Sequence, residues 1–159
     1  MQKPGQTKHA LLTTRLIFAL LLGFGAPSQA AEFLNPPGDA ALGLPFSDGV
    51  RVGNMLILSG KLGTLPGTTQ LVPGGIKAEA KQTMENIKTS LERYGAGMKN
   101  IVKCTVMIAD INEWADFNEV YVTYFPGPKP ARSAFGAAGL AFNGRVEVEC
   151  WAELPNSTQ

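Results

Sequence analysis

Residues 76–108, IKAEAKQTMENIKTSLERYGAGMKNIVKCTVMI, decide the fold, because a helical pattern passes almost directly into a strand pattern. Apolar side chains recur every three or four positions in the first part: Ala80, Met84, Ile87 and Leu91. This spacing predicts a helix over 76–94, which Gly95 and Gly97 end. The second part predicts a strand over 101–108, with one face that carries Val102, Cys104, Val106 and Ile108. We therefore expect a helix packed on a sheet that contains this strand.

A second helix and two further strands follow this stretch. Asp110 or Asn112 can cap a helix over 113–124, and an aromatic row forms its inward face: Trp114, Phe117, Tyr121 and Tyr124. We expect this row to be core rather than a stacking platform. Prolines at 126, 128 and 130 end the helix and lead to a short strand over 133–135. Residues 145–154 predict a strand that buries one face and carries Glu147, Glu149 and Trp151 on the other.

The chain before the stretch contributes a hairpin. Residues 50–52 and 55–59 are strand-like runs, and the Gly53-Asn54 pair between them is typical of a tight turn. Residues 60–75 are predicted to be a loop, and residues 31–45, which are rich in Pro, Gly and Ala, an extended arm. The order ββ-α-β-α-ββ indicates an α+β domain of two layers, with two helices over one face of the sheet.

Residues 1–30 have the pattern of a secretory signal peptide. Three cations precede an apolar core over 16–24, and small residues suit cleavage after Ala30. A membrane anchor is the alternative, but the apolar core has about half of the roughly 20 residues that a spanning helix needs. Cleavage would leave a protein of one domain in the periplasm or outside the cell.

Cleavage would also remove the only histidine, His9. A mature protein without imidazole has no Ser-His-Asp triad, no Cys-His dyad and no histidine-built metal site, and we expect neither a metal nor a cofactor. The leader holds three cations and no acid, so its loss turns the formal net charge of +1 negative. Since no basic run remains, the sequence argues against nonspecific nucleic-acid binding.

Arg132 and Glu147 are the candidate catalytic residues. Three prolines stiffen the chain before Arg132, whose guanidinium offers paired donors to a carboxylate or phosphate; a surface arginine or a salt-bridge partner is the alternative. Glu147 and Glu149 share one strand face, where their repulsion on burial can raise the pKa of one acid. Such an acid can donate a proton or hold a water. The alternative is a solvated face, or acids that pair with cations.

Weaker signals come from the Ser59-Gly60-Lys61 segment and from Asn118. Gly60 could let a ligand approach the backbone closely, and Lys61 could add a positive charge. An ordinary strand exit is the alternative, and the upstream glycines of a phosphate-binding loop are missing. Asn118 is at best a hydrogen-bonding wall residue.

Cys104 and Cys150 are the only cysteines. Export would permit a disulfide between them. Both lie in strand-like apolar runs, however, where a free cysteine behaves as a small buried apolar residue. We therefore expect two buried thiols rather than a bridge.

Several segments together resemble the Rid family of reactive-intermediate deaminases, the YjgF-like proteins. The matching segments are VGNMLILSG over 52–60, QTMENI over 82–87, IVK over 101–103, DIN over 110–112, PARS over 130–133 and VEVE over 146–149. The resemblance extends from Phe46 to Leu154. It implies a chorismate-mutase-like fold with a mixed sheet over residues 46–155, and a homotrimer whose ligand clefts lie between neighbouring subunits.

The same resemblance implies an activity, the hydrolysis of reactive enamines and imines such as 2-aminoacrylate to 2-keto acids and ammonia. This is the reaction of 2-iminobutanoate/2-iminopropanoate deaminases. The resemblance implies that Arg132 binds the substrate carboxylate and that Glu147 positions or activates water, with no cofactor. It also implies a set of pocket residues: Phe46, Ser59, Gly60, Asn118 and Ala134.

Three positions depart from the family pattern. Phe46 stands where a pocket tyrosine is usual, so a hydroxyl is lost. Lys61 stands where many members carry an uncharged glutamine, and could favour a more anionic ligand. Ala141 follows Gly139-Leu140 where proline is common. The lost hydroxyl and the leader support an alternative function, a non-catalytic trimer that binds small carboxylates in the cell envelope.

Overall fold

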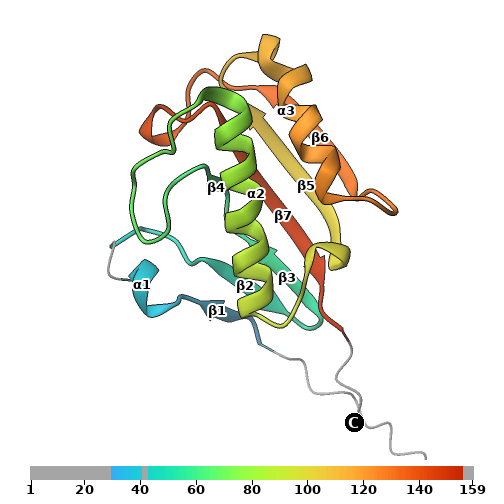
Figure 1. The fold of residues 1–159 in the computed structure, drawn as a ribbon. Coiled ribbons are helices and arrows are strands. Elements are labelled where there is room, and N and C mark those ends of the chain that lie inside the picture. Colours follow the sequence, from blue (N-terminus) through green and yellow to red (C-terminus); the bar gives the residue numbers. More distant parts are fainter. Residues whose placement is uncertain (1–29, 41–42, 156–159) are drawn as a thin grey trace, which may run out of the picture.

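The computed structural model describes residues 30–40 and 43–155, whose strands form one mixed sheet (Figure 1). The strands are β1 (Glu32–Leu34), β2 (Gly49–Val52), β3 (Met55–Leu58), β4 (Lys61–Leu62), β5 (Ile101–Ile108), β6 (Ala131–Gly136) and β7 (Val146–Glu153). Their order across the sheet is β1-β2-β3-β7-β5-β6, and β4 also pairs with β7. Only β5 and β6 run parallel among these pairs. The sheet is therefore mixed, as expected.

Two helices, one long and one short, cover the same face of this sheet (Figure 1). They are α2 (Gly75–Arg93) and α3 (Trp114–Tyr121), and a short α1 (Pro37–Ala40) precedes them. Single 3-10 turns extend α3 at both ends, at Ile111–Glu113 and Val122–Tyr124. The predicted second helix over 113–124 is thus an α-helix with a tighter last turn. The predicted α+β class, with two layers and two helices on one face, is confirmed.

Two predictions about irregular segments were wrong. The expected arm over 31–45 contains β1, which pairs with β2, and also α1. The expected loop over 60–75 contains β4, which pairs with β7 at Glu147 and Val148. The predicted leader, Ala30 apart, lies outside the described residues. None of the helices in residues 30–40 and 43–155 has the length and apolar character that a membrane span requires.

The core lies between the sheet and the two helices. Its fully buried members include side chains from both layers: Leu56, Met84, Ile87, Leu91, Val106, Ile108 and Val148. The aromatic row of α3 contributes Phe117 and Tyr121, so its assignment to the core holds for these two residues. Val102 does not share the buried face, because a register shift between Ile101 and Lys103 turns it outward, where it is 42% exposed.

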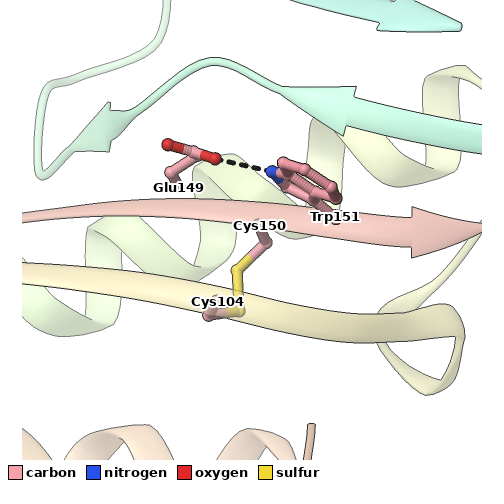
Figure 2. Close-up of a disulfide and its surroundings, with 4 residues drawn as sticks. All are labelled: Cys104, Glu149, Cys150 and Trp151. Carbon is pink, nitrogen blue, oxygen red and sulfur yellow. Dashed lines mark hydrogen bonds between the residues drawn. A yellow bond between two sulfur atoms is a disulfide. The ribbon is translucent and has the colours of Figure 1, made fainter. Parts of the chain in front are cut away.

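The expectation of two free thiols was also wrong, because Cys104 and Cys150 form a disulfide (Figure 2). They lie directly opposite each other on β5 and β7, with their Cα atoms 4.2 Å apart. Both side chains point to the buried face, so their sulfur atoms meet. Each strand was predicted from the sequence, but the register that aligns the cysteines was not. The bond ties together two strands that are central to the sheet.

Candidate active site

Arg132 is held by one face of α3. Its position on β6 lies next to Cys104 of β5, so its side chain points toward the helices. The Nη1 atom donates a hydrogen bond of 2.8 Å to Oδ1 of Asn118. The guanidinium carbon also lies 5.4 Å from the ring centroid of Trp114 and 4.8 Å from that of Tyr121, which are cation–π distances. The guanidinium therefore has a defined position before any ligand binds.

A broad hollow of about 690 Å³ opens beside this guanidinium. Its walls come from α3 and from the segment that leads into β6: Ala115, Asn118, Glu119, Tyr121, Val122, Lys129, Pro130 and Arg132. The hydroxyl of Tyr121 is buried there without a hydrogen-bond partner among the described residues. Burial raises the pKa of this phenol, against the lowering effect of the Arg132 charge. Arg132 and Asn118, both sequence candidates, thus share one site.

Glu147 lies on the opposite face of the sheet, against the backbone of Gly60. Its neighbours Val146 and Val148 are fully buried, so strand alternation turns Glu147 away from the core. A Cβ atom at Gly60 would lie 2.8 Å from the carboxylate carbon of Glu147, closer than real Cβ contacts allow. Glycine therefore lets the Glu147 carboxylate approach the backbone closely, and a larger residue would displace that side chain.

Burial raises the pKa of Glu147, and the charge of Glu149 raises it further. Glu149 itself accepts a hydrogen bond of 2.6 Å from Nε1 of Trp151, on the same strand (Figure 2). The predicted raised pKa of one of the two acids is therefore present in Glu147, and burial contributes more to it than Glu149 does. A carboxyl group of this kind exchanges a proton nearer to neutral pH than an ordinary glutamate does.

A second cavity, of about 270 Å³, lies beside Glu147. The segment from β3 to β4, the loop over 64–69 and α2 enclose it. Its lining includes Phe46, Gly60 and Glu147, which the sequence analysis had singled out, together with Lys61 and Arg93. Three predicted site residues are therefore brought together here.

Asp48 forms a network in this cavity wall that the sequence did not reveal. Its carboxylate, 4% exposed, is paired with the ammonium of Lys61 and accepts hydrogen bonds from Tyr94 (2.7 Å) and Ser90 (3.3 Å). Arg93 lies 3.6 Å away. Burial by itself would raise the pKa of Asp48, but the charge of Lys61 and these hydrogen bonds outweigh it and lower the pKa. Ser90, Arg93 and Tyr94 lie more than 40 positions from Asp48 in the sequence, so no local pattern signals these contacts.

Ser59 and Ala134 lie outside the walls of both cavities, as far as the described residues show. The Ser59 hydroxyl donates to the carbonyl oxygen of Ser47 at 2.6 Å, and its amide donates to that of Asp48 at 3.0 Å. Ser59 thus holds the segment that carries Asp48 in place through two hydrogen bonds. Ala134 packs against the hydrophobic core. Among the residues that the structure describes, no group of three or more His, Cys, Asp or Glu side chains could hold a metal ion.

A single chain does not bring Arg132 and Glu147 together. Along β5, Arg132 lies opposite Cys104 and Glu147 lies opposite Met107. Three residues along a strand span about 10 Å, and two strand spacings add about 10 Å in the perpendicular direction. The two side chains also point to opposite faces, and the two cavities share no lining residue. The candidate site therefore consists of two halves.

Comparison with known proteins identifies the family. Residues 39–154 match the family described as Endoribonuclease L-PSP. Bovine 2-iminobutanoate/2-iminopropanoate deaminase is 46% identical over 113 residues, which are 71% of this chain and 82% of that protein.

Solved structures agree with this assignment. Yeast Mmf1 superposes with a TM-score of 0.71 at 32% identity, over 79% of this chain and all of that chain. TdcF of E. coli, solved with bound serine, superposes with a TM-score of 0.66 at 31% identity, over 70% of this chain and 90% of that chain. The predicted YjgF-like fold is thereby confirmed. The chain belongs to the endoribonuclease L-PSP family, the family of the Rid or YjgF-like proteins.

Proposed function

We propose that this protein is a hydrolytic deaminase of small 2-imino acids, such as 2-iminobutanoate and 2-iminopropanoate. One observation carries the proposal: a guanidinium held in place by α3 is available for a carboxylate, and a glutamate of raised pKa is available for water. The bovine relative bears the name of this activity and is 46% identical. Membership in the same family makes the shared reaction the simplest assignment.

The reaction follows from the two halves. Arg132 binds the substrate carboxylate with paired charge-assisted hydrogen bonds, which fixes the adjacent C=N carbon. Glu147 takes a proton from water as the oxygen adds to this carbon and passes that proton to the imine nitrogen, which gives a 2-amino-2-hydroxy acid. Glu147 then takes the hydroxyl proton and delivers it to the amino nitrogen as the C–N bond breaks, which leaves the keto group. The imine and one water thus yield one 2-keto acid and one ammonia, with no oxidant.

We infer further that a homotrimer completes the site. Since Arg132 and Glu147 point to opposite faces of one sheet, the simplest complete site joins Arg132 of one protomer to Glu147 of the next. The uncovered sheet face supports association, because it exposes the large apolar side chains of Trp151 (41%) and Phe135 (49%). Exposed apolar side chains of this size on one face favour burial between copies.

The test of the activity is direct. An amino-acid oxidase generates the imino acid, semicarbazide traps it, and the mature protein should suppress the trapping. Arg132→Ala should abolish this suppression, because the substrate loses its carboxylate partner. Asp116→Asn is the control, since Asp116 lies on the neighbouring helix and pairs with Lys77 at the surface. Equal suppression by wild type and Arg132→Ala would overturn the enzymatic proposal.

The second candidate function is a non-catalytic trimer that binds small carboxylates. Phe46 favours it, because this cavity residue lacks the hydroxyl that the family usually supplies there. Binding of 2-oxobutanoate without suppression of trapping would support this alternative. A ribonuclease, which the family description names, is disfavoured, because the only histidine lies in the predicted leader and no basic run is present.

We also propose that the protein is exported to the periplasm or secreted. The pattern of residues 1–30 supports this, and so does the Cys104–Cys150 disulfide, because such bonds persist mainly in oxidising compartments. N-terminal sequencing of the exported protein should begin at Ala31 or one residue later. A cytosolic chain that begins at Met1 would overturn the export proposal and leave the fold and the activity untouched.

A further inference from the structure

The wall of the cavity beside Glu147 holds two cations that the proposed reaction does not use. Lys61 and Arg93 both line this cavity, and the buried carboxylate of Asp48 lies between them. Because the pKa of Asp48 is lowered, this carboxylate is ionised at neutral pH and carries one negative charge. Asp48 thus has two cations beside it, of which Lys61 is closely paired and Arg93 makes the longer contact.

Arg93 is the cation that remains available to a ligand. The Lys61 side chain is 15% exposed and its ammonium is closely paired with Asp48, whereas the Arg93 side chain is 40% exposed and its Nη1 atom lies 3.6 Å from the same carboxylate. A guanidinium has five N–H donors, so one long ion pair leaves most of them free.

The rest of the lining suits a short apolar chain between two polar ends. Leu44, Leu62 and Phe142 line the same cavity as Glu147 and Arg93, together with polar side chains such as Thr64, Asn86 and Thr89. The volume of about 270 Å³ lies near the lower end of the range for small-molecule sites. A ligand with a few methylene groups would bury them against these apolar side chains.

We propose that this wall is a subsite for a second acid group, so that the preferred substrates are 2-imino acids with a distal carboxylate. The reacting carbon lies at Glu147, and the distal carboxylate binds Arg93 with support from Lys61. This inference rests on the proposed deaminase function for the reaction itself. The preference for a second acid group can, however, be measured without catalysis.

The experiment measures the binding of the stable keto acids that the reaction would yield. Isothermal titration of the full mature protein compares 2-oxoglutarate with 2-oxobutanoate. We expect wild type to bind 2-oxoglutarate about tenfold more tightly, because a charge-assisted hydrogen bond in a partly buried site contributes at least that factor. Diacids of four, five and six carbons then measure the reach of the subsite.

Arg93→Gln should lower this affinity ratio about tenfold, and Arg93→Lys should retain much of it, because the charge persists. Arg51→Gln is the matched control, since Arg51 is also 40% exposed and pairs with one acid, Glu32, on the strands β1 and β2. Its ratio should equal that of wild type.

The outcomes separate this inference from the proposed function. A ratio near one in wild type, or a ratio that Arg93→Gln leaves unchanged, would overturn the subsite even if 2-iminobutanoate is hydrolysed. A high ratio that Arg93→Gln abolishes would support the subsite even if no imino acid is hydrolysed, and the deaminase proposal alone would then fail.

Discussion

Arg132 contacts three side chains of α3 before any ligand binds. Asn118 accepts its hydrogen bond, and the rings of Trp114 and Tyr121 lie within cation–π distance. A guanidinium held in this way loses less conformational entropy when a substrate orders it. Asn118 is therefore best described as a positioning residue, which acts through Arg132.

Asn118→Ala should lower kcat/KM for 2-iminobutanoate by roughly tenfold, because one hydrogen bond to a charged group is lost. Most of the change should be in KM, since the guanidinium can still reach the carboxylate but is less well oriented. Steady-state kinetics of imine hydrolysis measure kcat and KM separately. Asp116→Asn, on the same helix, should behave as wild type. A fall in kcat with unchanged KM would contradict the positioning role.

Glu147 has a raised pKa, with burial as the main cause and Glu149 as the second. As a general base it must be ionised, so kcat/KM should fall as the pH drops through its pKa. Glu149→Gln removes the neighbouring negative charge that disfavours ionisation. The pKa of Glu147 then decreases, and the acid limb of the pH profile should move to lower pH.

The direction of this shift is the test. A pH profile of kcat/KM with and without the Glu149→Gln change measures it directly. Glu153→Gln is a suitable control, because Glu153 lies at the end of the same strand and accepts its hydrogen bond from Asn54. An acid limb that stays in place, or moves to higher pH, would contradict the raising effect of Glu149 on the pKa of Glu147.

Among the elements, those with a long local pattern were predictable. The helix predicted over 76–94 is α2, Gly75–Arg93, because four apolar positions repeat along it and two glycines follow. The strand β7 was equally clear from its alternation. In contrast, β1 and β4 have three and two residues, and each exists because a distant strand supplies its hydrogen bonds. Their sequences carry no period long enough to detect.

The same reasoning explains what could be predicted of the site. Arg132 and Glu147 were predicted as candidates because prolines precede Arg132 and a strict alternation surrounds Glu147. The network of Asp48 was not found, since its partners Ser90 and Tyr94 lie 42 and 46 positions away and belong to α2 and its end. The disulfide was missed for a related reason, because strand register is a tertiary property.

The disulfide between β5 and β7 closes a loop of 46 residues, for which loop entropy gives a stabilisation of about 4 kcal/mol. Urea unfolding at one fixed protein concentration should therefore show a lower midpoint with a reductant than without it. Cys150→Ala is the control, because it has no bridge and should be insensitive to the reductant. A wild-type midpoint that the reductant does not change, once thiol titration proves full reduction, would contradict this stabilising role.

At the scale of the whole molecule, the proposed active site needs an oligomer, because one chain keeps its two halves apart. Arg132 faces the helix layer, and Glu147 faces the uncovered side of the sheet. If a trimer joins them, each active site takes one half from each of two neighbouring protomers. A monomer would contain both half-sites but no complete site, so it should not hydrolyse the imine. Analytical ultracentrifugation should detect the trimer.

Subunit mixing tests this arrangement more sharply than sedimentation does. Arg132→Ala and Glu147→Gln should each be inactive as pure proteins. When they are unfolded together and refolded, a mixed trimer can place the intact Arg132 of one chain beside the intact Glu147 of its neighbour. Each mixed trimer contains one such complete site, so the mixture should recover up to about a quarter of wild-type activity.

The control is to refold each variant separately and to combine the two afterwards, which should give no activity as long as protomers do not exchange. If both halves acted within one chain, every protomer in the mixture would lack one of them. The mixture would then stay inactive however it was prepared. Recovery on joint refolding alone therefore separates a site shared between protomers from a site within one chain, and it does so without a structure of the assembly.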